Sequence, residues 1–318
     1  MIQVPSMPPW ATAALYTLTS LLGVLVNKAV FSSFHFPYPV FILLAQLAVT
    51  TAVMSCMYGG MPRSRPTQFI PLLVVAALFI FNVLTGLVAL ETASLPMFSV
   101  FRRLSALAVM LFEALVFGKR ESRRVERAVA LMTLGSVLAA VGEVRPDWRG
   151  YLMVMLNNLA TAWYLVALKK VSSLSSMKQV DSLAMTYYTN ALAVPLTAAA
   201  FWWWEWRPTA DDDEELLGFV AALHHQLHQH GGRFVVALLV SACSALAVNV
   251  TTLWCTASNS PLTTAIAGQT KNLLQTALGF VFWEYHFTAL NAVGLTLAAI
   301  GSAMFAHAKF TRAARSNR

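Results

Sequence analysis

The chain has 318 residues, of which 58% are hydrophobic and only 11% are charged, and its mean hydropathy is +0.62. Soluble domains carry about 25% charged residues, so this composition excludes an ordinary soluble protein and indicates a polytopic membrane protein. Basic connectors on one side of the membrane account for most of the net charge of +8, which therefore predicts no nucleic-acid partner.

Ten apolar segments are long enough to cross the ~30 Å hydrocarbon core of a bilayer. They are predicted at 10–31, 37–58, 69–90, 95–117, 125–143, 149–170, 181–204, 233–256, 260–283 and 286–309. The long connector at 205–232 is expected to be a solvated lumenal loop. The predicted fold class is an all-α polytopic membrane protein with ten transmembrane helices.

The distribution of basic residues predicts the orientation, because short cytosolic connectors retain Lys and Arg. With ten spans both termini lie on one side, and that side also holds Arg123, Arg124 and Arg127. Both termini are therefore predicted to be cytosolic, with the 205–232 connector in the lumen.

The ten spans divide near residue 148 into two sets of five, residues 1–148 and 149–318. An offset of 165 residues aligns Pro96 with Pro261. An odd number of helices in each half inverts one half relative to the other, and such repeats build transporter sites near the bilayer midplane. We therefore predict two inverted five-helix repeats.

Two spans carry cations at a depth where hydrocarbon is expected. Arg102 and Arg103 lie about two turns into span 95–117, and Lys271 lies ~16 Å into span 260–283. A charge at the centre of a transmembrane helix costs ~2.5–3.5 kcal/mol, so each cation is expected to face a water-filled cavity or a partner. For one arginine, snorkelling to the interface is the alternative, since adjacent residues point ~100° apart.

Acidic partners for these cations are scarce in the sequence. Glu113 is the one carboxylate inside the predicted spans and away from their ends. The cations are therefore expected to bind an anion that the substrate supplies, such as a phosphate. Gly268, one turn before Lys271, lets either a ligand or a neighbouring helix approach the backbone.

The seventh span adds aromatic and amide side chains at Tyr187, Tyr188 and Asn190. Such groups stack on nucleobases and bind their edges, which makes these residues candidates for contact with a base. An interfacial aromatic belt is the alternative for the two tyrosines.

The chain has too few suitable residues in its predicted spans for catalysis or for metal binding. The spans hold too few carboxylates and histidines for acid–base or metal catalysis, and the three cysteines suggest neither a disulfide framework nor a metal set. The i, i+4 pair His224 and His228 can bind Zn²⁺ on a helix, but a solvated loop explains it better. We predict no catalytic residue, no bound metal and no cofactor.

Four segments resemble the nucleotide-sugar transporters of the drug/metabolite transporter superfamily. They are VNKAVFSSFHFPYPVFILLAQ (26–46), LPMFSVFRRLSALAVMLFEALVFGK (95–119), Tyr-Tyr-Thr-Asn-Ala (187–191) and NSPLTTAIAGQTKN (259–272). The branch that is most similar carries UDP-glucuronic acid, UDP-N-acetylgalactosamine and UDP-N-acetylglucosamine. The resemblance implies that the lysine motif of the family lies at Gly268, Lys271 and Asn272 and its tyrosine/asparagine motif at Tyr187, Tyr188 and Asn190. Thr264 joins this expected substrate-binding set.

The resemblance also implies a function. A nucleotide-sugar antiporter in the Golgi or endoplasmic reticulum membrane would exchange a cytosolic nucleotide sugar for a lumenal nucleoside monophosphate. The single Asn190 and the three-residue step from Gly268 to Lys271 favour a UDP-sugar. A GDP-mannose/GMP antiporter, or a phosphorylated-metabolite transporter of the same superfamily, is the alternative. The bilayer is the expected surrounding and a homodimer is a candidate assembly.

Overall fold

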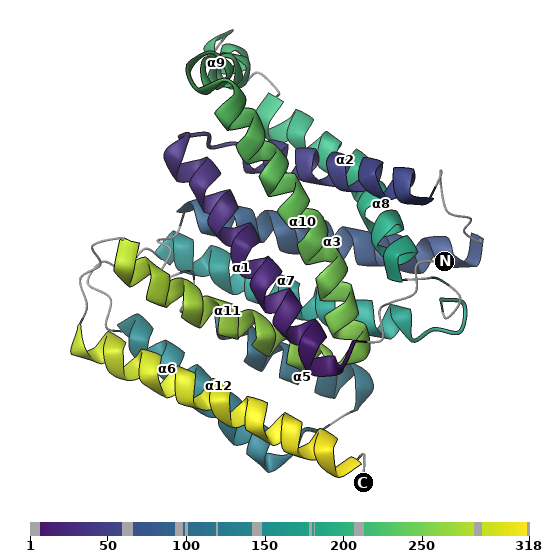
Figure 1. Ribbon diagram of the computed structural model, residues 1–318, viewed down its shortest axis with the longest axis vertical. Helices are drawn as coiled ribbons and strands as arrows, with labels where there is room; N and C mark the ends of the chain where they lie inside the picture. Colours follow the sequence, from purple (N-terminus) through teal and green to yellow (C-terminus); the bar gives the residue numbers. More distant parts are fainter. Residues whose placement is uncertain are drawn as a thin grey trace.

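The structure is a computed structural model that describes residues 7–58, 66–92, 98, 101–118, 120–141, 148–177, 180, 182–206, 213–282 and 288–316. These residues are helical wherever they form regular structure, with no strand among them (Figure 1). The predicted all-α class is therefore confirmed for the described part of the chain.

The helices follow the predicted apolar segments closely. Proline begins several of them, where its missing N–H costs nothing. Their bounds are α1 Pro9–Ser33, α2 Pro39–Tyr58, α3 Pro66–Thr92, α5 Ser105–Phe117, α6 Arg123–Val141, α7 Trp148–Ser172, α8 Ser182–Phe201, α9 Asp213–His230, α10 Gly232–Ser258, α11 Pro261–Phe282 and α12 Ala289–Ser316. A short π-helix, η1 (Trp202–Trp206), continues α8.

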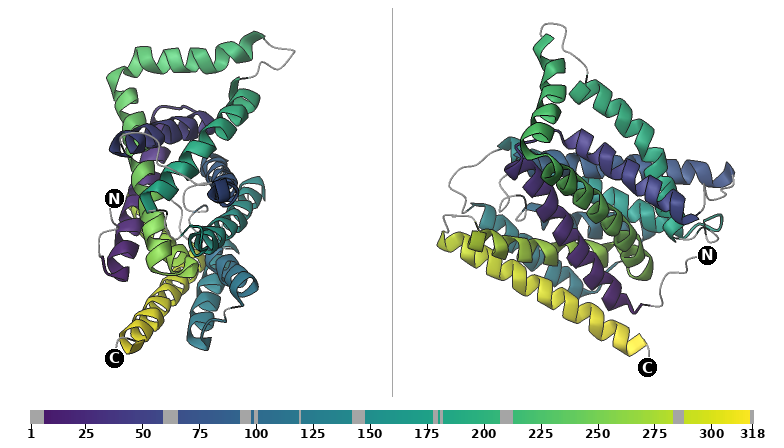
Figure 2. Two further views of the ribbon diagram at one scale, coloured as in Figure 1. Left: turned by 90° about the vertical axis from the view of Figure 1, so that its right-hand side faces the viewer. Right: turned by 45° about the horizontal axis from the view of Figure 1, so that its top comes forward.

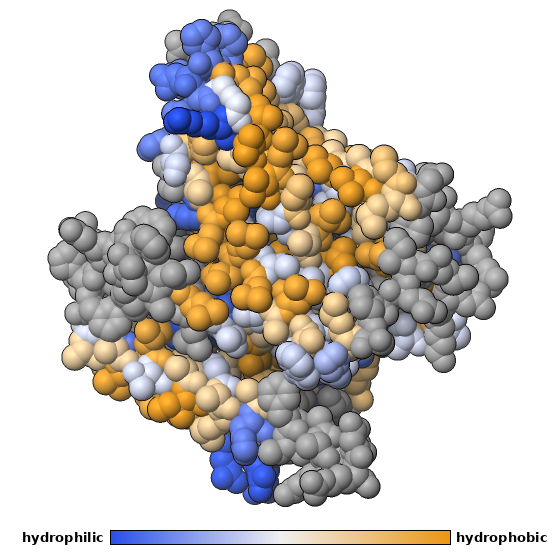
Figure 3. Space-filling model, viewed as in Figure 1, coloured by the Kyte–Doolittle hydropathy of each residue, from blue (hydrophilic) through white to orange (hydrophobic). Residues whose placement is uncertain are grey.

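Six of these helices, within the described residues, are both long and apolar enough to cross a membrane. They lie in α1, α2, α3, α7, α10 and α12. The apolar helix α5 is shorter, and α6, α8 and α11 also fall on predicted spans without belonging to the six. Hydrophobic residues cover the middle of the face in Figure 3, while hydrophilic residues gather at α9. The chain is thus an integral membrane protein.

The predicted span 95–117 is not one regular helix in its described part. The chain makes a turn at Arg103 and Leu104, where the Leu104 N–H donates to the Phe101 carbonyl at 3.0 Å, and α5 begins only at Ser105. At its other end α5 stops at Gly118, whose φ of 61° is the left-handed conformation that glycine tolerates. Arg102 and Arg103 therefore lie just before α5, at a break between helical segments.

The predicted solvated loop at 205–232 is wrong for residues 213–230, which form α9. This helix crosses the end of the bundle (Figure 2), which we call the α9 end. Phe219 of α9 is buried against Phe36, Tyr38, Phe41 and Phe201, with ring centroids 5.0 to 6.3 Å apart. A loop was expected because the connector is rich in acidic and histidine residues, yet one apolar face is enough to order it.

The α9 end is also joined through a carboxylate. The Glu205 side chain accepts hydrogen bonds from the Val40 and Phe41 N–H groups at 2.7 and 2.8 Å. These N–H groups open α2, so a carboxylate caps that helix where its dipole favours negative charge. We call Phe219 together with Phe36, Tyr38, Phe41, Phe201 and Trp206 the α9 aromatic cluster.

The helices of the bundle pack in a small set of pairs. Helix α1 lies against α10 and α11, α7 lies against α3 and α5, and α2 crosses α8. Helices α6 and α12 pack against each other more extensively than any other pair and form a layer of their own along one edge (Figure 1). The main hydrophobic core draws on α2, α3, α5, α6, α7, α8, α10, α11 and α12.

Candidate functional site

A polar network between α3 and α7 holds Arg102. Its guanidinium donates to the Asn157 side-chain oxygen and, at 2.6 Å, to the Thr161 hydroxyl. Asn157 in turn donates to the Thr85 hydroxyl at 3.0 Å, and Thr161 donates to the Asn82 side-chain oxygen at 2.6 Å. Each partner is itself hydrogen-bonded, so the network fixes the position of a cation inside an apolar bundle.

Arg102 and Lys271 lie within electrostatic range of each other inside the bundle. Lys271 is buried, with 6% of its surface exposed, and makes no hydrogen bond or ion pair with a residue that the structure describes. Two like charges held together away from bulk water repel, and an anion between them would relieve the cost. We call Arg102 and Lys271 the cation pair.

Tyr16 of α1 completes this region, although no motif or spacing in the sequence singles it out. Its hydroxyl lies against Gly268, where an added Cβ would be 3.4 Å away. The Tyr16 hydroxyl also lies within electrostatic range of Arg102 and is hydrogen-bonded to the Ser20 side chain. Thus Gly268 lets α1 approach α11 beside the cation pair, and a phenol that can donate to an anion lies there.

Arg103 lies elsewhere in the packing. Its side chain is 1% exposed, and none of its three guanidinium nitrogens has a hydrogen-bond partner in the described part of the chain. No described contact links it to Lys271. The structure therefore places only one arginine of the pair near the lysine, because the turn at Arg103 directs the two side chains apart.

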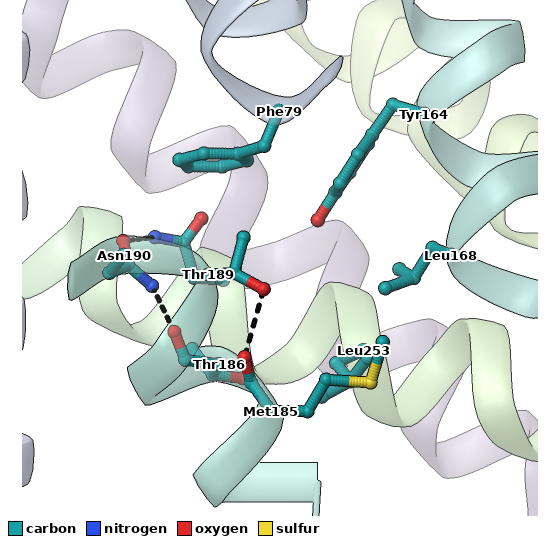
Figure 4. Close-up of a pocket in the computed structure, with 9 residues that line it drawn as sticks. Phe79, Tyr164, Leu168, Met185, Thr186, Thr189, Asn190 and Leu253 are labelled. Atoms are coloured by element: carbon teal, nitrogen blue, oxygen red, sulfur yellow. Dashed lines mark hydrogen bonds between the residues drawn. The ribbon is translucent and has the colours of Figure 1, made fainter. Parts of the chain in front are cut away.

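Asn190 of α8 lies in a small cavity between α3, α7, α8 and α10 (Figure 4). Its side chain accepts a hydrogen bond from Asn249 Nδ2 at 3.1 Å and donates to the Thr186 carbonyl at 2.7 Å. The Phe79 ring and the Tyr164 hydroxyl face it from across the cavity. The volume is only about 10 Å³, about one water, so a nucleobase would enter only after the helices separate.

Tyr187 and Tyr188 do not line this cavity. Both are buried in the main core, and their rings meet edge to face with centroids 5.4 Å apart. The structure therefore places both rings in the packed core, and their contact with a base stays a prediction. The alternative of an interfacial belt does not describe them, because neither ring is exposed.

Two further residues of the sequence prediction have structural partners. Thr264 is buried where α10 meets α11, with its hydroxyl 3.1 Å from the Thr256 hydroxyl. Glu113 is also buried, and its carboxylate accepts from the Leu262 N–H at 3.2 Å, at the N-terminus of α11. Asn272 lies in α11, but its side chain is outside the described residues.

Sequence reasoning singled out the cations but not the network that holds one of them. Asn82 and Asn157 lie in two of the predicted spans, and in the structure they join α3 to α7. Thr85 and Thr161 carried no signal, because hydroxyl residues are common in membrane helices and usually bond to their own backbone.

The site can bind and neutralise an anion, but it does not assemble an acid–base pair. Glu113, the buried carboxylate nearest to these residues in sequence, caps a helix. Apolar helices that enclose a buried cation pair define an integral membrane protein of the carrier class.

The comparison with known proteins identifies the family. The chain belongs to the Triose-phosphate Transporter family, whose model matches residues 11–306. It is a transporter and not an enzyme, and the resemblance to nucleotide-sugar transporters is confirmed by its relatives.

Three relatives match nearly the whole chain. "UDP-sugar transporter UST74c" of Drosophila melanogaster is 33% identical over 306 residues, covering 95% of this chain and 78% of its own length. "UDP-sugar transporter sqv-7" of Caenorhabditis elegans is 28% identical and covers 97% and 91%. "GDP-fucose transporter 1" of Dictyostelium discoideum is 26% identical and covers 93% and 79%. A protein crystal structure, 15% identical, matches with a TM-score of 0.58 over 91% and 95% of the two chains, a likeness of fold alone.

Proposed function

We propose that this protein is a nucleotide-sugar antiporter that moves a cytosolic nucleotide sugar, favoured to be a UDP-sugar, into the Golgi or endoplasmic reticulum lumen. A nucleoside monophosphate returns in exchange. The observation that carries this proposal is the cation pair. Arg102 and Lys271 come from opposite predicted halves, and both are held inside the bundle, Arg102 by Asn157 and Thr161 and Lys271 one turn from the contact of Gly268 with Tyr16.

A phosphate group suits the cation pair. Arg102 donates from a planar fork fixed by Asn157 and Thr161, and Lys271 supplies a compact point charge on a flexible stem. Together with the Tyr16 hydroxyl they would offset the charge of a diphosphate in a region of low dielectric. A nucleotide sugar carries a diphosphate and a nucleoside monophosphate carries a single phosphate, so both present a phosphate group and one site serves both substrates.

The helix pairs support two inverted repeats of five helices, 1–148 and 149–318. The repeats place each helix of the first half in correspondence with one of the second: α1 with α7, α2 with α8, α3 with α10, α5 with α11 and α6 with α12. When corresponding helices are exchanged, the packed pair α1–α10 becomes the packed pair α7–α3. The same exchange converts α1–α11 into α7–α5. It leaves the pairs α2–α8, α5–α11 and α6–α12 unchanged. A pseudo-twofold relation of this kind supports a ten-helix fold that alternates access around a central site.

Obligatory exchange follows from the electrostatics of the empty carrier. Without an anion, the two cations repel, and closing the bundle around them removes more water and raises their cost. A bound phosphate lowers that cost, so the loaded carrier would reorient faster than the empty one.

The base would lie beside Asn190. Uracil has one N–H donor between two carbonyl acceptors, which one asparagine and the hydroxyls of Thr189 and Tyr164 can match. The two UDP-sugar transporters described above support this choice. The similarity to a GDP-fucose transporter keeps a GDP-sugar/GMP antiporter as the second candidate.

Membrane placement follows the basic residues, with both termini cytosolic and α9 in the lumen. The lipid bilayer surrounds the protein, and a homodimer is the candidate assembly.

Uptake into proteoliposomes tests the whole proposal. Vesicles that contain the purified protein and are preloaded with UMP, with GMP or with buffer alone are given a radiolabelled UDP-sugar. We expect uptake only into UMP-loaded vesicles. Inhibition by excess GMP and not by excess UMP would establish the guanosine alternative, while exchange driven only by inorganic phosphate or triose phosphate would point to a phosphorylated-metabolite transporter.

A further inference from the structure

A second cavity, of about 140 Å³, lies between α1, α2, α3 and α10. It adjoins the Asn190 cavity, because Phe79 and Asn249 line both. The polar residues that line it are Ser20, Asn27, Gln46, Ser244 and Asn249, and none of the described lining residues is charged.

Gln46 and Asn27 each use only one of the two polar atoms of their amide in hydrogen bonds to described residues. Gln46 Nε2 donates to Asn27 Oδ1 at 3.0 Å and to Ser241 Oγ at 2.8 Å, and the Ser241 hydroxyl donates to Asn27 Oδ1 at 2.7 Å. These bonds use both hydrogens of the Gln46 amide and leave its Oε1 and Asn27 Nδ2 without a partner among the described residues. The network therefore fixes both amides and leaves one acceptor and one donor for another molecule.

Asn249 repeats this pattern at the boundary between the two cavities. Its Nδ2 donates to Asn190 Oδ1 at 3.1 Å, and its Oδ1 has no hydrogen bond to a residue that the structure describes. The wall thus presents two amide acceptors and one amide donor beside the apolar ring of Phe79. A hydroxyl group both donates and accepts, so a ring that carries several hydroxyls matches this set.

A short path joins this cavity to the cation pair. Ser20 lines the cavity and is hydrogen-bonded to the Tyr16 hydroxyl, which lies against Gly268 and near Arg102. One ligand can therefore place an anionic group at the cation pair and a neutral group next to it in the cavity.

We infer that this cavity binds the sugar ring of the nucleotide sugar and that it prefers an uncharged hexose. The inference rests on the proposed function and adds the position and charge of the sugar. Because the lining amides are neutral and no cation is among them, a uronic acid would bring an uncompensated carboxylate into a buried space. The protein should therefore favour UDP-glucose over UDP-glucuronic acid.

Exchange by the full chain in proteoliposomes tests this inference. The half-saturation concentrations of UMP, UDP-glucose and UDP-glucuronic acid are measured for the wild type and for Gln46→Leu, which keeps the side-chain size and removes the amide. We expect the UDP-glucose value to rise at least tenfold, while the UMP value changes less than threefold. The control is Gln68→Leu, because Gln68 is an equally buried amide that bonds to the Ser176 carbonyl at 2.8 Å and lines neither cavity.

A second variant covers the case in which Gln46→Leu does not fold. Gly23→Ala leaves every hydrogen bond in place and sets a methyl group in the cavity wall, 3.3 Å from Val248 Cγ2 and 3.6 Å from the Ser244 hydroxyl. It should raise the half-saturation concentration of UDP-glucose and leave that of UMP unchanged. Parallel changes for both ligands in the variants that fold, or a wild-type preference for UDP-glucuronic acid, would overturn the sugar site alone. A wild type that exchanges no uridine nucleotide would instead remove the proposed function.

Discussion

Tyr16 of α1 lies directly against Gly268 of α11, so that a Cβ at residue 268 would be 3.4 Å from the tyrosine hydroxyl. This contact brings two helices together beside the cation pair. An alanine would make an ordinary contact there, whereas a β-branched side chain would displace the phenol.

The first prediction concerns this contact. Gly268→Ala should retain most of the transport rate, and Gly268→Val should lower it at least tenfold while the amount of folded protein changes little. Initial uptake rates, normalised to protein recovered in a monodisperse peak, give the comparison. Wild-type uptake by Gly268→Val would show that the position of Tyr16 does not matter for transport.

Lys271 is predicted to be indispensable for transport and not for folding. Because its ammonium is buried next to Arg102, Lys271→Ala should abolish exchange without reducing thermal stability. Lys271→Arg should also fail, since a planar fork does not replace a point charge in the same space. Lys170→Ala is the matched control, because Lys170 is exposed at the end of α7. Exchange by Lys271→Ala at the control rate would contradict the assignment.

Substitutions of the two neighbouring arginines, Arg102 and Arg103, should differ in their effect on exchange. Arg102→Met should lower exchange at least tenfold, because it removes a cation that Asn157 and Thr161 hold in place. Arg103→Met should leave exchange within about twofold and should not lower the melting temperature, since an apolar side chain replaces a buried guanidinium without hydrogen-bond partners among the described residues. Equal loss in both variants would mean that Arg103 contacts the substrate in another conformation.

Close packing of α6 against α12 yields a stability prediction. A Cβ at Gly294 would lie 2.4 Å from the Ala139 backbone nitrogen, so Gly294→Ala cannot be accommodated unless the two helices separate. We expect a markedly lower melting temperature in detergent. Gly232→Ala is the control, because nothing lies within 4 Å of a Cβ there. Equal melting temperatures for the two variants would show that α6 and α12 are not packed in this way.

The α9 aromatic cluster provides a further prediction, for stability at the α9 end. Phe219→Ala should cost ~3 kcal/mol, within the range of large-to-small core substitutions, because Phe219 is buried against rings from other segments. Deletion of residues 209–229 should likewise destabilise the protein. Replacing the exposed His224 and His228 with alanine, or adding a chelator, should leave exchange unchanged. Thermal unfolding and uptake of each variant test these effects, and strict zinc dependence would contradict the last one.

Much of the fold was predictable because it depends on periodic apolar length. Each predicted span overlaps an observed helix, and the ends agree within a few residues for α1, α2 and α6. The two errors share a physical cause. The connector 205–232 is rich in acidic and histidine residues, and the region before α5 carries two adjacent arginines. The conformations of both depend on contacts with distant segments, such as Phe219 with Phe36 and Arg102 with Asn157.

The sequence by itself determined that the chain crosses a membrane and carries cations in its spans, because burying a charge in hydrocarbon is too expensive to be incidental. Only the tertiary structure decided which cations meet. Arg102 and Lys271 are 169 positions apart in the chain, and their approach depends on how α7 and α11 pack and on the network that binds one guanidinium and not its neighbour. Tyr16 shows the same limit, since its role arises from the absent side chain of Gly268 on another helix. Composition and periodicity report what a residue can do, whereas helix packing determines which residues act together.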